Sequence, residues 1–144
     1  ISMRVHRNSS LRLSSGSWPV YLAGVDYPFS RTEKQQEAYL KEALSEVPQE
    51  AFVILLAHHP DFIKTAFEHD IPVTMAGHTH GGQISLPYLT EKILPANGKK
   101  YVKGLFSIGS EGQTKLFVTK GTGMTKLPFR FMNVPEIVAI EVSP

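Results

Sequence analysis

The sequence contains no cysteine among its 144 residues. This absence excludes disulfide bonds and thiolate metal sites, and it leaves imidazole and carboxylate as the metal-ligating groups of the chain. Long hydrophobic runs are missing too, because no apolar stretch approaches the roughly 20 residues that a membrane-spanning helix needs. We therefore expect a globular protein without a transmembrane helix.

An excess of either charge is also absent. The 15 lysines and arginines oppose 13 aspartates and glutamates, which gives a formal net charge of +2. The basic residues are scattered rather than clustered, so the sequence indicates no nucleic-acid partner. A length of 144 residues with 42% hydrophobic content is typical of about one globular domain.

Short apolar runs alternate with a helical pattern in the first half of the chain, which predicts an α/β fold. The predicted strands of this half span residues 20–25, 51–57 and 73–76. One helix is predicted to start at a capping box of Ser30 and Glu33 and to end before Pro48. A shorter helix is predicted over residues 62–68.

The second half of the chain is predicted to be mostly strand. Breakers such as Pro87 and Pro95 indicate a long loop over residues 86–100. A hairpin follows, and its two strands are expected at 104–108 and 115–119. The last predicted strand covers residues 136–142.

Histidines come directly after two of the buried strands. The strand at 51–57 leads into His58, and the strand at 73–76 leads into Gly77-His78-Thr79-His80-Gly81-Gly82-Gln83. We refer to residues 77–83 as the histidine turn. Ligands of open α/β sheets gather beyond the carboxyl ends of the strands, so these histidines occupy a favourable place for a site.

The histidine turn is interpreted as a metal-binding segment. In extended backbone, His78 and His80 point to the same side with Cα atoms about 6.6 Å apart, which suits one metal ion or two neighbouring ions. Glycines at positions 77, 81 and 82 tolerate positive φ and let a ligand approach the backbone closely. The alternatives are a tight turn without metal and, for His58 taken alone, a structural histidine.

The residues alone leave two metal arrangements open. In the first, His58, His78 and His80 hold one zinc ion together with a water molecule. In the second, two metal ions share the site, which normally needs a bridging carboxylate. Asp26 is expected to be a turn residue or a helix cap, and Asp61 to cap a helix or orient an imidazole, so neither is an obvious bridge.

The histidine motifs resemble those of a known family. Residues 55–61 (Leu-Leu-Ala-His-His-Pro-Asp) and 76–84 (Ala-Gly-His-Thr-His-Gly-Gly-Gln-Ile) are similar to the last two metal motifs of calcineurin-like metallophosphoesterases. The similarity continues through residues 24–26, 117–123, 128–130 and 135–137. It is strongest to a membrane-associated bacterial branch that includes lipid-handling pyrophosphatases and cell-wall-associated phosphodiesterases.

This resemblance implies a four-layer αββα sandwich with a mixed sheet and flanking helices. It implies two divalent metal ions, of manganese, iron, zinc or magnesium, that activate a hydroxide to hydrolyse a phosphodiester, phosphomonoester or pyrophosphate, with a lipid-linked substrate as one option. By analogy with the family, His58 and His78 would bind one metal and His80 the other.

The family's other metal motifs, Asp-x-His, Gly-Asp and Asn-His, do not occur in the sequence. The resemblance therefore implies that residues 1–144 are the C-terminal part of a single metallophosphoesterase domain whose N-terminal half lies outside this sequence. Such a chain is expected to be nearly inactive alone, since it lacks the bridging carboxylate and an upstream histidine. The alternative is a non-catalytic metal-binding or scaffold protein that has kept the fold.

His59 and Arg130 are the candidate substrate-binding residues. His59 stands where asparagine is common in the branch, and it is expected either to hydrogen-bond a phosphate or to be exposed. Arg130 is expected to contact phosphate bidentately or, as the favoured alternative, to pair with Glu136. Tyr27 replaces a frequent acidic residue of the branch, and Lys120 is expected to be solvated.

The loop after the histidine turn is unusually apolar. Its apolar residues are Pro87, Tyr88, Leu89, Ile93 and Leu94. We expect this loop either to meet a lipid-like substrate or membrane surface, or to pack against its own domain. The resemblance accordingly favours a bacterial protein, either cytoplasmic or peripherally associated with a membrane. His6 and His69 are expected to be structural or surface residues.

Overall fold

A computed structural model describes residues 6–13, 18–27, 32–85, 100–126 and 128–141. Two sequence predictions fall outside these ranges. They are the capping role of Ser30 and the apolar loop from Pro87 to Leu94.

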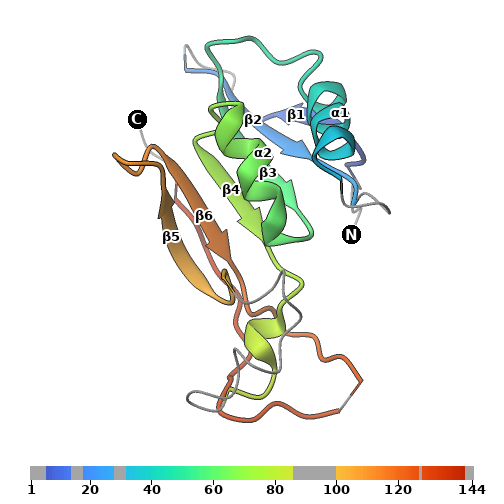
Figure 1. The fold of residues 1–144 in the computed structure, drawn as a ribbon, viewed down its shortest axis with the longest axis vertical. Helices are drawn as coiled ribbons and strands as arrows, with labels where there is room; N and C mark the ends of the chain where they lie inside the picture. Colours follow the sequence, from blue (N-terminus) through green and yellow to red (C-terminus); the bar gives the residue numbers. More distant parts are fainter. Residues whose placement is uncertain (1–5, 14–17, 28–31, 86–99, 127, 142–144) are drawn as a thin grey trace.

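The described residues form one six-stranded mixed sheet with the strand order β1-β2-β3-β4-β6-β5 (Figure 1). The strands are β1 (Ser9–Arg12), β2 (Val20–Gly24), β3 (Phe52–Ala57), β4 (Val73–Ala76), β5 (Gly104–Ile108) and β6 (Thr114–Val118). The central strands β2, β3, β4 and β6 pair in parallel, and the outer strands β1 and β5 pair antiparallel to their neighbours. The predicted α/β class and the predicted hairpin are therefore confirmed.

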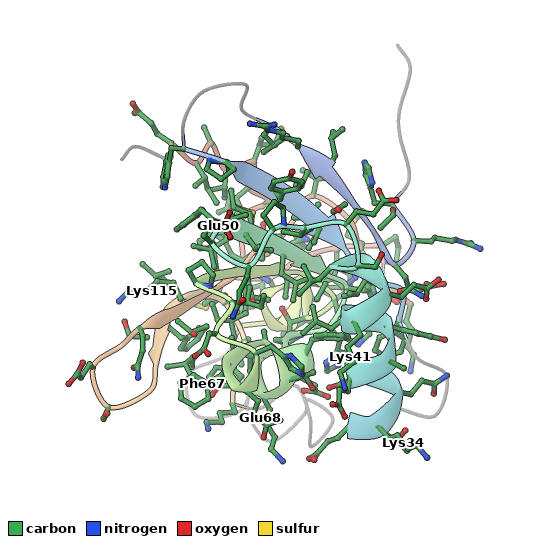
Figure 2. All side chains as sticks on the ribbon, turned by 90° about the horizontal axis from the view of Figure 1, so that it is seen from above. Lys34, Lys41, Glu50, Phe67, Glu68 and Lys115 are labelled. Atoms are coloured by element: carbon green, nitrogen blue, oxygen red, sulfur yellow. The ribbon has the colours of Figure 1, made fainter. Side chains whose placement is uncertain are left out.

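Two helices cover one face of the sheet (Figure 1). They are α1 (Glu33–Ala43) and α2 (Ile63–Glu68), and the 3-10 turns η1 (Pro60–Phe62) and η2 (His80–Gly82) complete the helical elements. Figure 2 shows the side chains of Lys34, Lys41 and Glu68 on the outer surface of the two helices. None of the helices among the described residues is both long and apolar enough to cross a membrane.

The predicted first helix is correct in place but too long at both ends. It begins after the N-cap Thr32, whose side chain makes no capping hydrogen bond, and it ends at Ala43. A turn follows, in which the amide of Val47 donates to the carbonyl of Leu44. Leu44 and Val47 pack against the core from this turn rather than from the helix.

The core lies between the helices and the sheet. Alternate residues of each strand point to this face, and the central strands contribute Leu55, Ala76 and Leu116, each buried. Leu40 of α1 and Ala66 of α2 close the core from the helical side with no exposed surface. The central strands thereby deliver their carboxyl ends to one rigid edge of the sheet.

The opposite face of the sheet is apolar and partly open. Leu56 of β3 and Leu105 of β5 are 37% and 66% exposed on this face. Residues 136–140 lie over it beside Met75 and Phe117, around a cavity of about 330 Å³. Within the described residues no helix covers this face, which we call the helix-free face.

One strand prediction is wrong, and one strand was not predicted. The predicted strand at 136–142 forms no strand in its described part, because residues 136–141 lie over the face of the sheet instead of beside an edge strand. Strand β1 was not predicted, since its sequence Ser-Ser-Leu-Arg has no apolar alternation.

Candidate metal centre

His58 and His78 meet at the carboxyl ends of two neighbouring strands. Strands β3 and β4 pair in parallel and end together, with Ala57 opposite Ala76. His58 follows β3 directly, and His78 lies two residues beyond β4. Nδ1 of His78 is 2.9 Å from Nε2 of His58, and the ring centroids are 4.8 Å apart. The predicted placement of these two histidines at the carboxyl ends of strands is therefore confirmed, while their role as metal ligands stays a prediction.

An aromatic cluster packs against this histidine pair. The ring of His59 contacts those of Tyr27 and His78, with centroid distances of 5.6 and 4.4 Å, and the Tyr27 and His78 rings lie 6.4 Å apart. His59 is only 4% exposed, so the alternative that it is an exposed residue is wrong. His58 and His78 themselves stay exposed, so the cluster lies beside the pair without covering it.

His80 stands apart from this pair. Its Nδ1 lies 3.1 Å from the carbonyl oxygen of Gly123. A carbonyl only accepts hydrogen bonds, so Nδ1 is the donor, and in the neutral imidazole Nε2 then has the lone pair. This arrangement, in which one ring nitrogen donates to a backbone carbonyl, is typical of metal-ligating histidines.

The histidine turn is not extended, and the predicted extended geometry of His78 and His80 is wrong. Both have positive φ angles, 67° and 50°, which non-glycine residues rarely adopt. Gly81 and Gly82 have the expected positive φ angles of 62° and 84°, whereas Gly77 does not. The ring of His78 contacts His58, whereas the ring of His80 contacts the carbonyl of Gly123.

The two aspartates have local roles. Oδ1 of Asp26 accepts a hydrogen bond from the amide of Tyr27, and the amide of Asp26 donates to Oδ1 of Asn8, while the residues directly after Tyr27 lie outside the described ranges. Asp61 lies beside His59, whose Nδ1 is 3.1 Å from Oδ2 and 3.2 Å from the amide nitrogen of Asp61. Asp61 therefore contacts an imidazole, but not one of the three predicted metal ligands.

Arg130 binds backbone carbonyl groups. Its guanidinium donates to the carbonyl oxygens of His80, Lys120 and Gly123. The pair predicted between Arg130 and Glu136 is not formed, because Glu136 is paired with Lys120.

Lys120 is an ion-pair partner rather than the solvated residue that was predicted. Its Nζ lies 3.0 Å from Oε2 of Glu136, and its amide donates to Oε1 at 2.8 Å. The amide and the ammonium of Lys120 hold the pKa of the Glu136 carboxyl below its usual range. These bonds fix the chain immediately after β6.

Within the described residues, no group of three or more His, Asp or Glu side chains is placed to hold a metal ion. The mononuclear arrangement requires His58, His78 and His80 to surround one point, and the structure does not bring them together in this way. A cavity of about 420 Å³ opens beside His58 on the helix-free face, and its lining includes His6, Leu56 and Thr119.

Asn133 and Gln83 also belong to this region, although the sequence did not single them out for a role. Nδ2 of Asn133 donates to the carbonyl of His80. The side chain of Gln83 accepts from the amide of Thr125 and donates to the carbonyl of Phe129. Polar side chains in an otherwise apolar C-terminal stretch were the available signal for Asn133.

Comparisons with known proteins found several relatives. The chain is 43% identical to the uncharacterized metallophosphoesterase YkuE of Bacillus subtilis over 94 residues. These aligned residues are 65% of this chain and 32% of YkuE. It is 32% identical over 89 residues to the phosphodiesterase YaeI of Escherichia coli, covering 62% of this chain and 32% of YaeI. It is 37% identical over 90 residues to the UDP-2,3-diacylglucosamine pyrophosphatase LpxG of Chlamydia trachomatis, covering 58% of this chain and 27% of LpxG.

These relatives confirm the resemblance predicted from the histidine motifs. The chain spans about a third of the length of the first relatives. No family model and no solved structure matches the chain.

Proposed function

We propose that this chain, a relative of metallophosphoesterases, supplies three histidine ligands to the two-metal centre of a phosphoesterase. The reaction is the hydrolysis of a phosphodiester, phosphomonoester or pyrophosphate bond. The observation that carries the proposal is the pair of imidazole nitrogens of His58 and His78, which lie 2.9 Å apart where two parallel strands end.

The donor set of this pair fits a divalent metal ion. Two imidazole nitrogens that bind one ion at about 2.0–2.1 Å lie about 2.9 Å apart at right angles and about 3.4 Å apart at the tetrahedral angle. The nitrogens of the pair are hydrogen-bonded at 2.9 Å, which is close to this range. We therefore assign His58 and His78 to one ion, while His80, with Nδ1 on the Gly123 carbonyl, would present Nε2 to the other.

Bound divalent ions of manganese, iron, zinc or magnesium would lower the pKa of a water molecule and polarise a phosphoryl oxygen. The residues of this chain would hold and orient them. Tyr27 and His59 pack against His78 and restrict its ring rotation. His59 reaches Asp61 through Nδ1, and Arg130 is engaged by carbonyl groups, so we assign both to support of the centre instead of to phosphate binding.

The proposal includes a missing part of the same domain. Residues 1–144 would be the C-terminal part of an αββα metallophosphoesterase domain, and the N-terminal half would contribute the remaining ligands, including the bridging carboxylate. Two observations support this: the chain spans about a third of its first relatives, and the helix-free face exposes apolar side chains such as Leu105. The chain alone would be nearly inactive.

For the substrate, a lipid-linked pyrophosphate is the candidate supported by similarity to LpxG, whose name describes a UDP-2,3-diacylglucosamine pyrophosphatase. A bacterial protein, cytoplasmic or attached peripherally to a membrane, fits such a substrate.

The test is manganese-stimulated hydrolysis of bis(p-nitrophenyl) phosphate by the complete protein. His78→Ala should lower kcat/KM by more than about 100-fold, since a metal ligand matters at least as much as its supporting groups. His69→Ala is the matched control, because His69 lies at the end of α2, away from the strand ends. Equal rates for the His78→Ala variant and the unaltered protein would reject the phosphoesterase proposal.

A further inference from the structure

The backbone of residues 80–83 is held in an unfavourable conformation. Four consecutive residues have positive φ: His80 at 50°, Gly81 at 62°, Gly82 at 84° and Gln83 at 51°. Two of the four are not glycine, and such residues rarely adopt this region. A conformation of this kind persists only where the surrounding structure imposes it, and it is common at functional sites.

Two side chains of the segment 120–133 impose this conformation through the carbonyl of His80. Nδ2 of Asn133 donates to this oxygen at 2.5 Å, and Arg130 donates to it at 3.3 Å. Asn133 is only 4% exposed and lies 53 positions further along the chain. Figure 1 shows the histidine turn beside the orange-red part of the chain that contains both residues.

Gly81 makes room for Asn133. A Cβ atom at Gly81 would lie 2.8 Å from Oδ1 and 3.0 Å from Nδ2 of Asn133. The amide group of Asn133 therefore packs directly against the turn whose carbonyl it binds.

Arg130 also connects the backbone of the turn to its imidazole. Its guanidinium donates to the carbonyl of Gly123, with Nε at 3.1 Å, and this same carbonyl accepts the hydrogen bond from Nδ1 of His80. The backbone and the ring of His80 are therefore held by the same residue.

We infer that Asn133 and Arg130 are positioning residues for His80: Asn133 fixes the left-handed backbone of the turn, and Arg130 fixes the carbonyl that orients the imidazole. The inference rests on the proposed function in taking His80 as a metal ligand. Neither residue touches the substrate. Both act by keeping Nε2 of His80 directed toward the metal centre.

The test uses Asn133→Asp and Arg130→Lys in the complete protein. The first removes the Nδ2 donor at nearly constant volume, and the second removes the planar fork that reaches three carbonyls. Gln49→Glu and Arg12→Lys are the matched controls, because they make the same chemical changes on exposed side chains far from the turn.

The first readout is the NMR spectrum of protein labelled with ¹⁵N in histidine and glycine. We expect both variants to shift the imidazole resonances of His80 and the amides of Gly81 and Gly82, while those of His58 stay in place. A merely structural role would shift both histidines together. Unchanged resonances of His80 in both variants, or equal shifts of His58 and His80, would overturn the inference.

The second readout is manganese affinity by calorimetry. Loss of a group that orients a metal-bound histidine weakens binding about 10- to 100-fold, and we expect this loss at the ion assigned to His80 in both variants. Affinities within twofold of the controls would overturn the inference. Failure of the proposed function is seen separately, as absence of hydrolysis by the unaltered protein, and it leaves the NMR result for His80 unaffected.

Discussion

The candidate centre combines a part built on regular strands with a part built on irregular backbone. His58 and His78 meet because β3 and β4 run in parallel and end at the same edge, with Ala57 opposite Ala76. His80 instead depends on positive φ angles and on hydrogen bonds from Arg130 and Asn133. The proposed ligand pair therefore follows from sheet topology, whereas the position of the third proposed ligand follows from long-range polar contacts.

Counting the metal ions bound by histidine variants tests whether the two parts of the centre bind separate ions. We expect two ions in the complete protein, one in His58→Ala, and still one in His58→Ala/His78→Ala, because these two residues share an ion. His58→Ala/His80→Ala should bind none. Elemental analysis of dialysed protein gives the counts, and equal counts for the two double variants would contradict separate ions for the two parts.

The strand-built part depends on the hydrophobic core. Leu55 of β3 has no exposed surface, so Leu55→Ala should lower the free energy of unfolding by about 2–5 kcal/mol. Leu13→Ala is the control, since Leu13 is 52% exposed, and it should change the free energy by less than about 0.5 kcal/mol. Urea denaturation measures both, and similar losses for the two variants would argue against the assigned core.

The turn-built part can be probed with two glycines of nearly equal φ. Gly81 at 62° contacts Asn133 and Lys120, whereas Gly121 at 59° has open space around its Cβ position. Gly121→Ala should cost about 1–2 kcal/mol from the left-handed backbone alone. Gly81→Ala should cost more, because its Cβ would lie 2.6 Å from Cγ of Lys120. The same urea titration compares them, and equal costs would show that the packing of Gly81 is unimportant.

The smallest expected effect concerns the ion pair between Lys120 and Glu136, which holds the start of the segment 120–133. The pKa of Glu136 is lowered by the amide and ammonium of Lys120, so its contribution to stability is present above the usual glutamate pKa. This contribution disappears as the pH falls through the lowered pKa. The unaltered protein should therefore exceed Glu136→Gln in stability by less than about 1 kcal/mol at neutral pH. The difference should vanish in acid, and a pH-independent difference would exclude the ionic contribution.

The parts of the fold that were predictable have strong local patterns. The run around Leu55 is apolar throughout, as expected of a strand buried on both sides, and it was predicted within one residue. Strand β1 has no such run, and residues 136–141 have the pattern of a strand but no neighbouring strand within the described residues. Local periodicity therefore identifies strands that complete their pairing within this chain.

Like the fold, the candidate site was predictable only where a local sequence pattern determines it. The position of His58 and His78 follows from two strand ends that local sequence reveals. The positive φ of His80 and its bond to Asn133 join residues 53 positions apart, so no local pattern contains them. The prediction that Arg130 pairs with Glu136 was also wrong. Arg130 donates to three backbone carbonyls, and the Glu136 carboxylate is paired with Lys120.

The central claim is that His58 and His78 bind one metal ion and His80 another. Anomalous X-ray diffraction from crystals of the complete protein grown with manganese tests it most directly. We expect two anomalous peaks, one within bonding distance of His58 and His78 and a second beside Nε2 of His80. A single peak bound by all three histidines, or no peak near them, would contradict it.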